Sequence, residues 1–362
     1  MTEKRKIVVG LSGGVDSSVA AWLLQQQGYE VIGVTMVNFR ENAGKEAEAA
    51  SDKIAADAAK VADFLGIEHH IVDFCQEFKE HVIDYFVKEY LSGRTPNPCV
   101  VCNRYIKWKA IMEEGRKYGA ELLATGHYAR TELLPNGRYA VRCSVSSAKD
   151  QTYALYDLTQ EQLSKTVMPL GSYTKDEIRA MAQKIGIPVA QKPDSMEICF
   201  IPDKDYARFI KAYTGIAVPE GNYVTKTGEI LGRHKGIIHY TIGQRKGLNL
   251  AMGHPVFVSE IRPETNEVVI GENSDILISA LKCSRLNAMS VPELATGMEV
   301  MAKIRYNHKG ANAVLERTGE DQLLVRFQEP QRAITPGQAV VFYRDGYVAG
   351  GGVIDGPVKE NN

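Results

Sequence analysis

The chain has 362 residues, of which 44% are hydrophobic and 24% are charged. This length predicts two or three domains, and the composition is typical of a soluble globular protein, which excludes a disordered or membrane-embedded chain. The formal net charge of −1 gives no indication of nucleic-acid binding through the field of the whole molecule, so such a partner would require local basic patches.

Six cysteines spread over this length do not indicate a disulfide framework. No apolar run is long enough to cross a bilayer, and the opening Met-Thr-Glu-Lys-Arg leads directly into a predicted strand, which leaves no room for a signal peptide. We therefore expect a cytoplasmic protein without a membrane partner, whose reduced cysteines serve catalysis or metal binding.

The first predicted elements are a short β-branched strand over 7–11 and a helix over 17–26. Small residues at a helix N-terminus leave backbone N–H groups free, and these groups together with the helix dipole bind anions. The turn between these two elements reads Ser12-Gly13-Gly14-Val15-Asp16-Ser17. It lacks the Gly-Lys-Ser/Thr ending of a Walker A loop. It resembles instead the pyrophosphate loop of the ATP-pyrophosphatase superfamily, whose members adenylate a carbonyl oxygen. The alternative is an ordinary glycine-rich turn.

Further strands and helices alternate along the first half of the chain, with strands predicted over 30–36, 69–74 and 122–127 and helices over 43–65 and 78–91. This alternation predicts parallel βαβ units and a doubly wound α/β sheet. Ligands bind such a sheet beyond the carboxyl ends of its strands, where the pyrophosphate loop, the residues after Met36 and the Gly126–His127 turn would meet. We expect an adenine pocket at that edge.

A second informative stretch is Thr95-Pro-Asn-Pro-Cys99-Val-Val-Cys102-Asn, which precedes a helix predicted from about 104 to 118. Cys102 would then lie near a helix N-terminus beside Arg104 and Lys107, and these conditions lower the pKa of a thiol and favour a thiolate nucleophile. A structural zinc site would need two more ligands. A thioredoxin-like redox motif would need a strand–helix setting that is absent here.

Two later motifs are ambiguous by themselves. The cluster Lys149-Asp-Gln-Thr-Tyr153 also fits a surface turn, and Cys199, between Ile and Phe, also fits a buried inert residue. Between them, 175–185 is predicted to form an amphipathic helix.

From about residue 203 the pattern changes to one amphipathic helix and then to short strands broken by glycine. From 282 onward, alternating runs predict a small antiparallel barrel, which by itself could be a stabilising appendage. We expect a catalytic domain over 1–202, a small mixed central domain over 203–281 and a C-terminal β-barrel over 282–362. Basic residues between 226 and 246 indicate a phosphate-binding groove.

These motifs occur together and in order, with Thr125-Gly-His-Tyr-Ala129 and Tyr240-Thr-Ile-Gly-Gln-Arg-Lys-Gly-Leu248 among them. Over essentially its whole length the chain resembles the bacterial-type tRNA-specific 2-thiouridylases, the MnmA family. The resemblance implies ATP- and Mg²⁺-dependent adenylation of the C2 oxygen of wobble uridine 34 and persulfide transfer that gives 2-thiouridine. It also implies as partners the tRNAs for Lys, Glu and Gln, a cysteine desulfurase or sulfur-relay protein, and a cellular reductant.

The resemblance assigns roles to matching residues. Cys102 would be the nucleophile and Cys199 the carrier of the persulfide. Some relatives have Asp at the position of Cys99, so the resemblance transfers no acid–base role to it. The ATP set would be Gly10, Leu11, Ser12, Gly13, Gly14, Val15, Asp16, Ser17, Met36 and Gly126, with Asp16 also near Mg²⁺. The tRNA set would be Asn97, Pro98, Cys99, His127, Lys149, Asp150, Gln151, Arg305, Tyr306 and Gln338.

Three alternatives stay open. Cys99, Cys102 and Cys199 could ligate three irons of a [4Fe–4S] cluster whose fourth iron carries sulfide. The chain could be a pyrophosphate-loop ligase that adenylates a small metabolite, in which case its cysteines would be incidental. It could also bind ATP and tRNA without catalysis.

Overall fold

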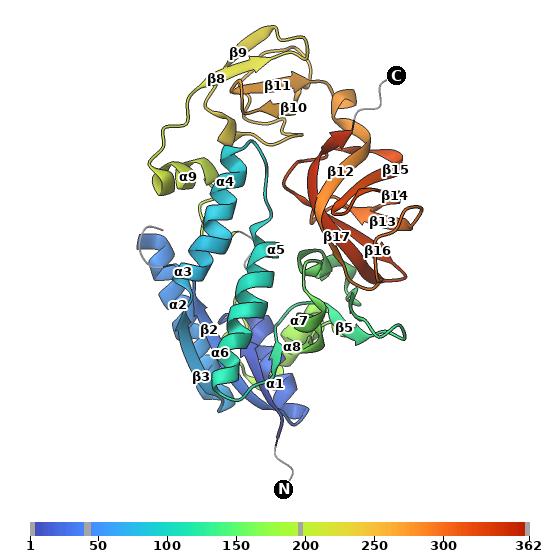
Figure 1. Cartoon of the computed structure of the whole chain (residues 1–362). Coiled ribbons are helices and arrows are strands. Elements are labelled where there is room, and N and C mark those ends of the chain that lie inside the picture. The colour runs from blue at the N-terminus through green and yellow to red at the C-terminus, as the bar shows by residue number, and fades with distance from the viewer. Residues whose placement is uncertain (1–3, 40–44, 195–197, 359–362) are drawn as a thin grey trace.

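The computed structural model describes residues 4–39, 45–194 and 198–358. Figure 1 shows three parts: an α/β part at the bottom, a small sheet at the top and a barrel on the right. None of the described helices is long and apolar enough to span a membrane. The predicted order of α/β part, small mixed domain and antiparallel barrel is confirmed, whereas the domain boundaries after 202 and 281 stay predictions.

The α/β part is built on a five-stranded, fully parallel sheet in the order β3-β2-β1-β4-β7. Its strands are β1 (Lys6–Gly10), β2 (Glu30–Val37), β3 (Glu68–Asp73), β4 (Leu122–Ala124) and β7 (Thr166–Val167). The side chains of β1 alternate between two buried clusters, with Ile7 and Val9 on one face and Val8 on the other. Helices therefore cover both faces of the sheet, which explains the continuous apolar run of this strand.

The helices of this part fall on the two faces of the sheet. One face packs against α1 (Val15–Gln26), α2 (Lys45–Leu65) and α8 (Lys175–Ile185). The other face packs against α3 (Cys75–Phe78), η1 (Lys79–Ile83), α4 (Asp84–Leu91), α5 (Pro98–Cys102), η2 (Asn103–Ala110) and α6 (Ile111–Lys117). Residues 43–44 of the helix predicted over 43–65 lie outside the described residues.

The helix that carries the Cys-x-x-Cys motif begins earlier than the predicted residue 104. Asn97 caps α5, because its Oδ1 accepts a hydrogen bond from the backbone N–H of Cys99 at 3.2 Å. Pro98 occupies the first helical position, where proline is tolerated because its missing N–H would have no partner there. From Asn103 the helix continues as the π-helical segment η2, and π-helical turns are frequent at functional sites.

A hairpin that the sequence did not reveal links the α/β part to the barrel. It consists of β5 (Arg130–Leu133) and β6 (Tyr139–Arg142), and β6 pairs with barrel strand β17 at Arg142 and Tyr347. The short elements that follow are η3 (Ser147–Lys149), η4 (Thr152–Leu155) and α7 (Gln160–Ser164).

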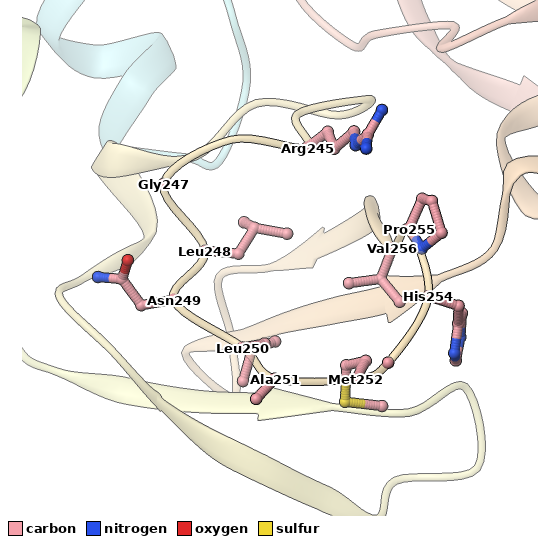
Figure 2. A pocket seen from close by; sticks show the side chains of 11 residues that line it. Arg245, Gly247, Leu248, Asn249, Leu250, Ala251, Met252, His254, Pro255 and Val256 are labelled. Carbon is pink, nitrogen blue, oxygen red and sulfur yellow. The ribbon is translucent and has the colours of Figure 1, made fainter.

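The central part contains α9 (Tyr206–Thr214), η5 (Ile237–His239) and a four-stranded mixed sheet. Its strands run in the order β10 (Phe257–Arg262), β11 (Glu267–Gly271), β8 (Gly221–Val224) and β9 (Ile230–His234), with only β11 and β8 parallel. The loop over 245–256 lines an open hollow of about 620 Å³, into which Leu248 and Val256 point (Figure 2). None of the predicted site residues lines this hollow.

After η6 (Asn273–Ile276), six antiparallel strands form the barrel. Their order is β12 (Leu277–Ala288), β15 (Gln322–Arg332), β14 (Ala311–Gly319), β13 (Glu299–Lys303), β16 (Ala339–Arg344) and β17 (Tyr347–Val358), and the pairing of β12 with β17 closes the ring. Inward-facing residues such as Leu281, Leu315 and Phe342 are fully buried in its core.

Candidate active site

Two serine hydroxyls at the start of α1 form hydrogen bonds with the backbone of the loop between β1 and α1. Ser17 Oγ accepts from the Ser12 backbone N–H at 3.2 Å and donates to the Gly14 carbonyl at 3.2 Å, and Ser18 Oγ donates to the same carbonyl at 2.7 Å. Gly14, which precedes the helix, provides no side-chain cap. The first N–H groups of α1 therefore have no intrahelical partner and are available to an anion.

The turn after β4 lies directly against this loop. A Cβ atom on Gly126 would lie 2.7 Å from the Ser17 nitrogen and 2.8 Å from the Asp16 carbonyl carbon, so the approach requires glycine. Strand β4 ends at Ala124, three residues earlier than predicted, and this leaves Thr125 to His127 in the turn. The structure thus brings Gly126 to the loop, while Met36 lies near the end of the neighbouring strand β2.

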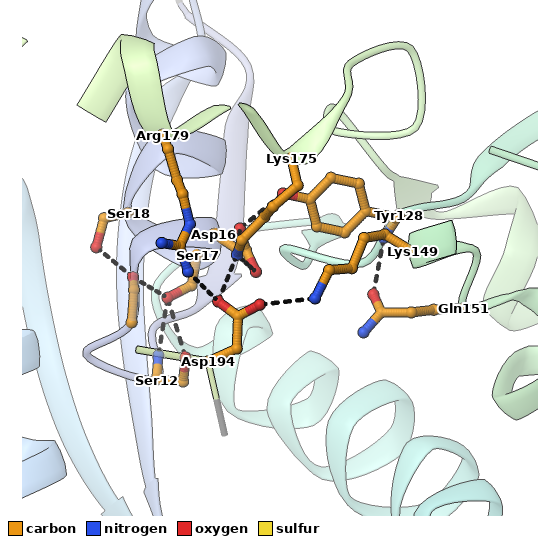
Figure 3. Close-up of polar contacts among 11 residues, drawn as sticks. Ser12, Asp16, Ser17, Ser18, Tyr128, Lys149, Gln151, Lys175, Arg179 and Asp194 are labelled. Carbon is orange, nitrogen blue, oxygen red and sulfur yellow. Dashed lines mark hydrogen bonds and ion pairs between the residues drawn. The ribbon is translucent and has the colours of Figure 1, made fainter. Parts of the chain in front are cut away.

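Beside the loop, an ion-pair cluster joins α1, α8 and Asp194 (Figure 3). Lys175 Nζ lies 2.8 Å from each carboxylate oxygen of Asp16 and 2.7 Å from Asp194 Oδ1. Asp194 also accepts from Lys149 at 2.9 Å and from Arg179 at 3.3 Å. Three cations therefore surround two carboxylates, which leaves the cluster with one excess positive charge.

Electrostatics keep Asp194 ionised in this cluster. Burial by itself would raise the pKa of Asp194, but the hydrogen bonds from Lys175 and Lys149 more than offset it, and the pKa lies well below its usual range. Sequence reasoning missed Lys175, Arg179 and Asp194 as site residues. Lys175 and Arg179 are spaced one helical turn apart at the start of a helix, which is the signal that could have indicated them.

The structure also brings the three predicted cysteines together. Cys99 and Cys102 lie one turn apart on the same helix, and the ionisation of Cys199 is disfavoured by both, so the three thiols are within electrostatic reach of one another. The positive charge of Lys107 lowers the pKa of all three thiols and that of His127. Among the described residues, no group of three or more His, Cys, Asp or Glu side chains is arranged to hold a metal ion.

The prediction of a lowered thiol pKa at Cys102 is wrong for this structure. Burial raises the pKa of Cys102 to about 11 and that of Cys199 to about 12, and Lys107 offsets only part of the effect. The predicted cause is missing because the helix begins at Pro98, so Cys102 lies at the end of α5 rather than at a helix N-terminus. Cys99 and Cys199 are nevertheless exposed residues, so protein atoms surround their thiols closely enough to raise the pKa without closing the two residues off from solvent.

Comparison with known proteins covers almost the whole chain. Three family models match it in succession: the "tRNA methyl transferase HUP domain" over residues 5–203, the "tRNA methyl transferase PRC-barrel domain" over 207–272 and the "Aminomethyltransferase beta-barrel domain" over 279–354. The curated tRNA-specific 2-thiouridylase MnmA of Lachnoclostridium phytofermentans is 56% identical over 354 residues, which is 97% of this chain and 99% of the relative. The chain belongs to the MnmA family.

Other members of the family are similarly close. The tRNA-specific 2-thiouridylase MnmA of Clostridium kluyveri is 50% identical over 354 residues, covering 97% of this chain and 99% of the relative. That of Clostridioides difficile is 48% identical over 358 residues, covering 98% of this chain and 99% of the relative. The family predicted from the motifs is therefore confirmed.

In this MnmA family member, several residues expected to contact tRNA already have protein partners. The Gln151 side-chain oxygen accepts from the Tyr128 backbone N–H at 2.9 Å, and the Asp150 carboxylate accepts from the Ser144 N–H at 2.8 Å. His127 Nδ1 lies 2.8 Å from the Thr125 hydroxyl. Burial lowers the pKa of His127 well below its usual range, and Lys107 lowers it further, so the imidazole is neutral at pH 7.

Two of the three barrel residues of the tRNA set contact the α/β part of this MnmA family member. The Tyr306 hydroxyl donates to the Asp150 carbonyl at 3.3 Å, and the Gln338 amide donates to the Thr95 carbonyl at 2.9 Å. Arg305 donates to the Arg332 carbonyl within the barrel at 2.9 Å. Tyr306 and Gln338 therefore lie at the junction between the barrel and the α/β part, and Gln338 contacts the segment that leads to the cysteines.

Proposed function

We propose that this chain is an ATP-dependent tRNA-uridine 2-sulfurtransferase, which converts the wobble uridine 34 of tRNA to 2-thiouridine. One observation carries the proposal: the turn after β4 contacts both the loop before α1 and the helix that bears Cys99 and Cys102. Gly126 lies against the loop, and the ring of its neighbour His127 lies 5.4 Å from the ring of Trp108, which is on the continuation of that helix. Lys107, on the same helix, lowers the pKa of His127 and of all three thiols. A nucleotide and a sulfur carrier can thus reach one base.

The first step activates the poor leaving group at uracil C2. The C2 oxygen attacks the α-phosphorus of ATP, the bond between the α- and β-phosphates breaks, and pyrophosphate leaves. The N–H groups at the start of α1 would hold the departing phosphates, with Lys149, Lys175 and Arg179 as counter-charges. Mg²⁺, when bound, would neutralise phosphate charge, and Asp16 is the carboxylate in the loop that would hold it together with the substrate phosphates. Because Asp16 is paired with Lys175 in this structure, Mg²⁺ would replace that ammonium group at the carboxylate.

The second step transfers sulfur. The terminal sulfur of a Cys199 persulfide attacks C2, the C2–O bond breaks, and AMP leaves. The Cys102 thiolate then attacks Cys199 Sγ, which breaks the S–S bond, releases 2-thiouridine and leaves a Cys102–Cys199 disulfide. A cellular reductant restores both thiols, and a cysteine desulfurase or sulfur-relay protein reloads Cys199. The target base has to leave its stack to reach this site.

The raised pKa values of both thiols place a requirement on the sulfur-transfer steps. Thiols with a pKa near 11 and 12 are protonated at pH 7, so Cys199 has to lose its proton as its sulfur attacks the terminal sulfur of the donor's persulfide, and Cys102 has to lose its proton as it attacks Cys199 Sγ. Cys199 is an exposed residue, so a donor protein can reach it. We propose the tRNAs for Lys, Glu and Gln as substrates and a cytoplasmic location, on the basis of the family.

The deciding experiment is mass spectrometry of nucleosides from unmodified tRNA-Lys, incubated with iron-free protein, ATP, Mg²⁺ and a persulfide donor. We expect 2-thiouridine, AMP and pyrophosphate. Pyrophosphate release without 2-thiouridine would contradict sulfur transfer through a persulfide. Absence of both products would favour a ligase that acts on a small metabolite, in which case Cys102→Ser would leave its activity intact.

The [4Fe–4S] alternative would use the same three thiols, Cys99, Cys102 and Cys199. Each thiolate would bind a different iron of the cluster, so the three sulfurs would not have to surround a single ion. We assign no step to a cluster. The persulfide route needs only Cys102 and Cys199.

A further inference from the structure

The segment over 93–96, which leads into α5, is held from two sides by other parts of the chain. The Thr95 backbone N–H donates to the Pro336 carbonyl of the barrel at 2.9 Å. The Thr95 hydroxyl lies 3.4 Å from the Thr241 hydroxyl of the central part. Arg94 donates to the Ile354 carbonyl of barrel strand β17 at 3.1 Å. The entry to the cysteine helix is therefore a junction of all three parts.

Gln338 provides the barrel's side-chain contact with this segment. Its Nε2 donates to the Thr95 carbonyl at 2.9 Å and to the Pro96 carbonyl at 3.3 Å. Its own carbonyl accepts from the Ile354 N–H at 2.8 Å, which fixes the backbone from which the side chain extends. Both hydrogens of the amide are thus directed at the protein, and an RNA contact would have to compete for them.

The neighbouring Gly337 shows how tight this junction is. It adopts a φ of +89°, and a Cβ atom there would lie 3.0 Å from the Thr95 nitrogen and 3.1 Å from Arg94 Cβ. The barrel backbone therefore approaches the Arg94–Thr95 backbone at a distance that only glycine permits.

Directly after this junction come the residues that begin α5. Asn97 caps the helix through the Cys99 N–H, and Pro98 is buried at the first helical position. Because Pro96 and Pro98 restrict the backbone on both sides of Asn97, a shift at Pro96 would be passed to the turn that bears Cys99. Cys102 follows one turn later on the same helix.

We propose that Gln338 is a positioning residue: by holding the Thr95 and Pro96 carbonyls, it fixes the Asn97–Cys99 turn and orients the thiols of Cys99 and Cys102. The role of these thiols in sulfur transfer rests on the proposed function, but the positioning itself does not. The barrel is then a structural part of the active site as well as a surface for RNA.

The test uses Gln338→Glu, which keeps the shape of the side chain, removes both N–H donors and places a carboxylate against two carbonyls. Hydrogen exchange is measured on the full-length protein without RNA. We expect the amides of Thr95 and Cys99 to exchange about tenfold faster than in the wild type, the factor expected for the loss of one hydrogen bond. Gln322→Glu, which makes the same change at an exposed position on the barrel, should leave this exchange unchanged.

Kinetics distinguish positioning from RNA binding. We expect kcat for thiolation to fall in Gln338→Glu while KM for tRNA is retained. If the Thr95 and Cys99 amides exchange at the wild-type rate in Gln338→Glu, the proposal is overturned, regardless of the activity of the variant. Faster exchange of these amides with an unchanged kcat would also overturn it. If Gln338→Glu does not fold, Gln338→Asn, whose donors are one methylene too short, gives the same exchange test. An inactive wild type would contradict the proposed function alone.

Discussion

Lys175 Nζ lies 2.8 Å from both carboxylate oxygens of Asp16, although 159 positions separate the two residues in the chain. The contact joins the first turn of α1 to the first turn of α8, so it ties the anion-binding loop to a second helix N-terminus. The Lys175 side chain is only 10% exposed, and the same ammonium group also contacts Asp194. Lys175 is thus the residue that connects the two carboxylates of the cluster.

Lys175→Met is expected to destabilise the protein by about 3 kcal/mol, because it leaves two partly buried carboxylates without their shared cation. Urea unfolding at pH 7 measures the effect. Lys184→Met makes the same change at an exposed position near the end of the same helix and should stay within about 0.5 kcal/mol of the wild type. Equal losses in the two variants would show that the Asp16–Lys175–Asp194 contact contributes nothing to stability.

The stability supplied by Asp194 is expected to depend on pH. Its pKa is lowered in the folded protein, so its contribution is fully present above the ordinary aspartate pKa of about 3.9 and is lost as the pH falls through that value toward the folded pKa. The difference in unfolding free energy between the wild type and Asp194→Asn should therefore be largest near pH 7 and shrink toward pH 3. A difference that does not change over this range would contradict the ion pairing.

Asp194→Asn should also strengthen the binding of inorganic pyrophosphate, by about tenfold. The substitution removes a carboxylate that competes for Lys149, Lys175 and Arg179, and one charge-assisted contact corresponds to about 1.4 kcal/mol. Isothermal titration calorimetry without Mg²⁺ measures the affinity. Asp176→Asn, at an exposed position on α8, is the matched control. Weaker binding in Asp194→Asn would mean that Asp194 orients the cations instead of competing for them.

The sequence predicted those parts of the site that depend on residues close together in the chain. Periodicity and glycine placement are local signals, and they indicated β1, the loop over 12–17 and the barrel strands. The partners of Asp16 could not be predicted in this way, because Lys175 and Tyr128 are distant in sequence and an amphipathic helix explains Lys175 equally well. The hairpin of β5 and β6 was missed because its pairing with β17 depends on how the barrel docks.

The error at Cys102 has a similar origin. The sequence showed the neighbouring Lys107, which does lower the pKa of the thiol, but it did not show the burial that outweighs this cation. Burial is a property of the assembled structure, so local charge by itself predicted the wrong direction. The Asn-Pro pair marked a turn correctly, but Asn97 and Pro98 turned out to cap and begin the helix rather than to precede it.

Cys102 should be alkylated slowly at pH 7, with a rate that rises about tenfold per pH unit toward its pKa near 11. Lys107→Met should slow the reaction at pH 8 roughly three- to tenfold, which corresponds to the loss of about 0.7–1.4 kcal/mol of attraction for the thiolate. Peptide-resolved mass spectrometry separates Cys102 from the other cysteines. Lys109→Met, at an exposed position on η2, is the control, and equal rates in the two variants would exclude an electrostatic role of Lys107.

The Cys99→Ser variant distinguishes the persulfide route, which uses Cys102 and Cys199, from a [4Fe–4S] cluster held by all three cysteines. Cys99 exposes its side chain, and its contact with Asn97 uses the backbone N–H, so serine preserves the start of α5. If Cys102 and Cys199 suffice, the variant should keep a substantial part of its 2-thiouridine formation, whereas Cys102→Ser and Cys199→Ser should lose at least about a hundredfold, as expected for the removal of a nucleophile.

The measurement is nucleoside mass spectrometry on anaerobically purified protein, with iron analysis of each preparation. Thermal unfolding of each variant shows whether the substitution has only destabilised the fold. A cluster held by three cysteines should fail to assemble in Cys99→Ser, so activity and iron would be lost together. Full loss of activity in a folded Cys99→Ser protein, with iron present in the wild type, would exclude the two-cysteine route. Activity retained in iron-free protein would exclude the cluster, because a reaction that proceeds without iron cannot depend on an iron–sulfur centre.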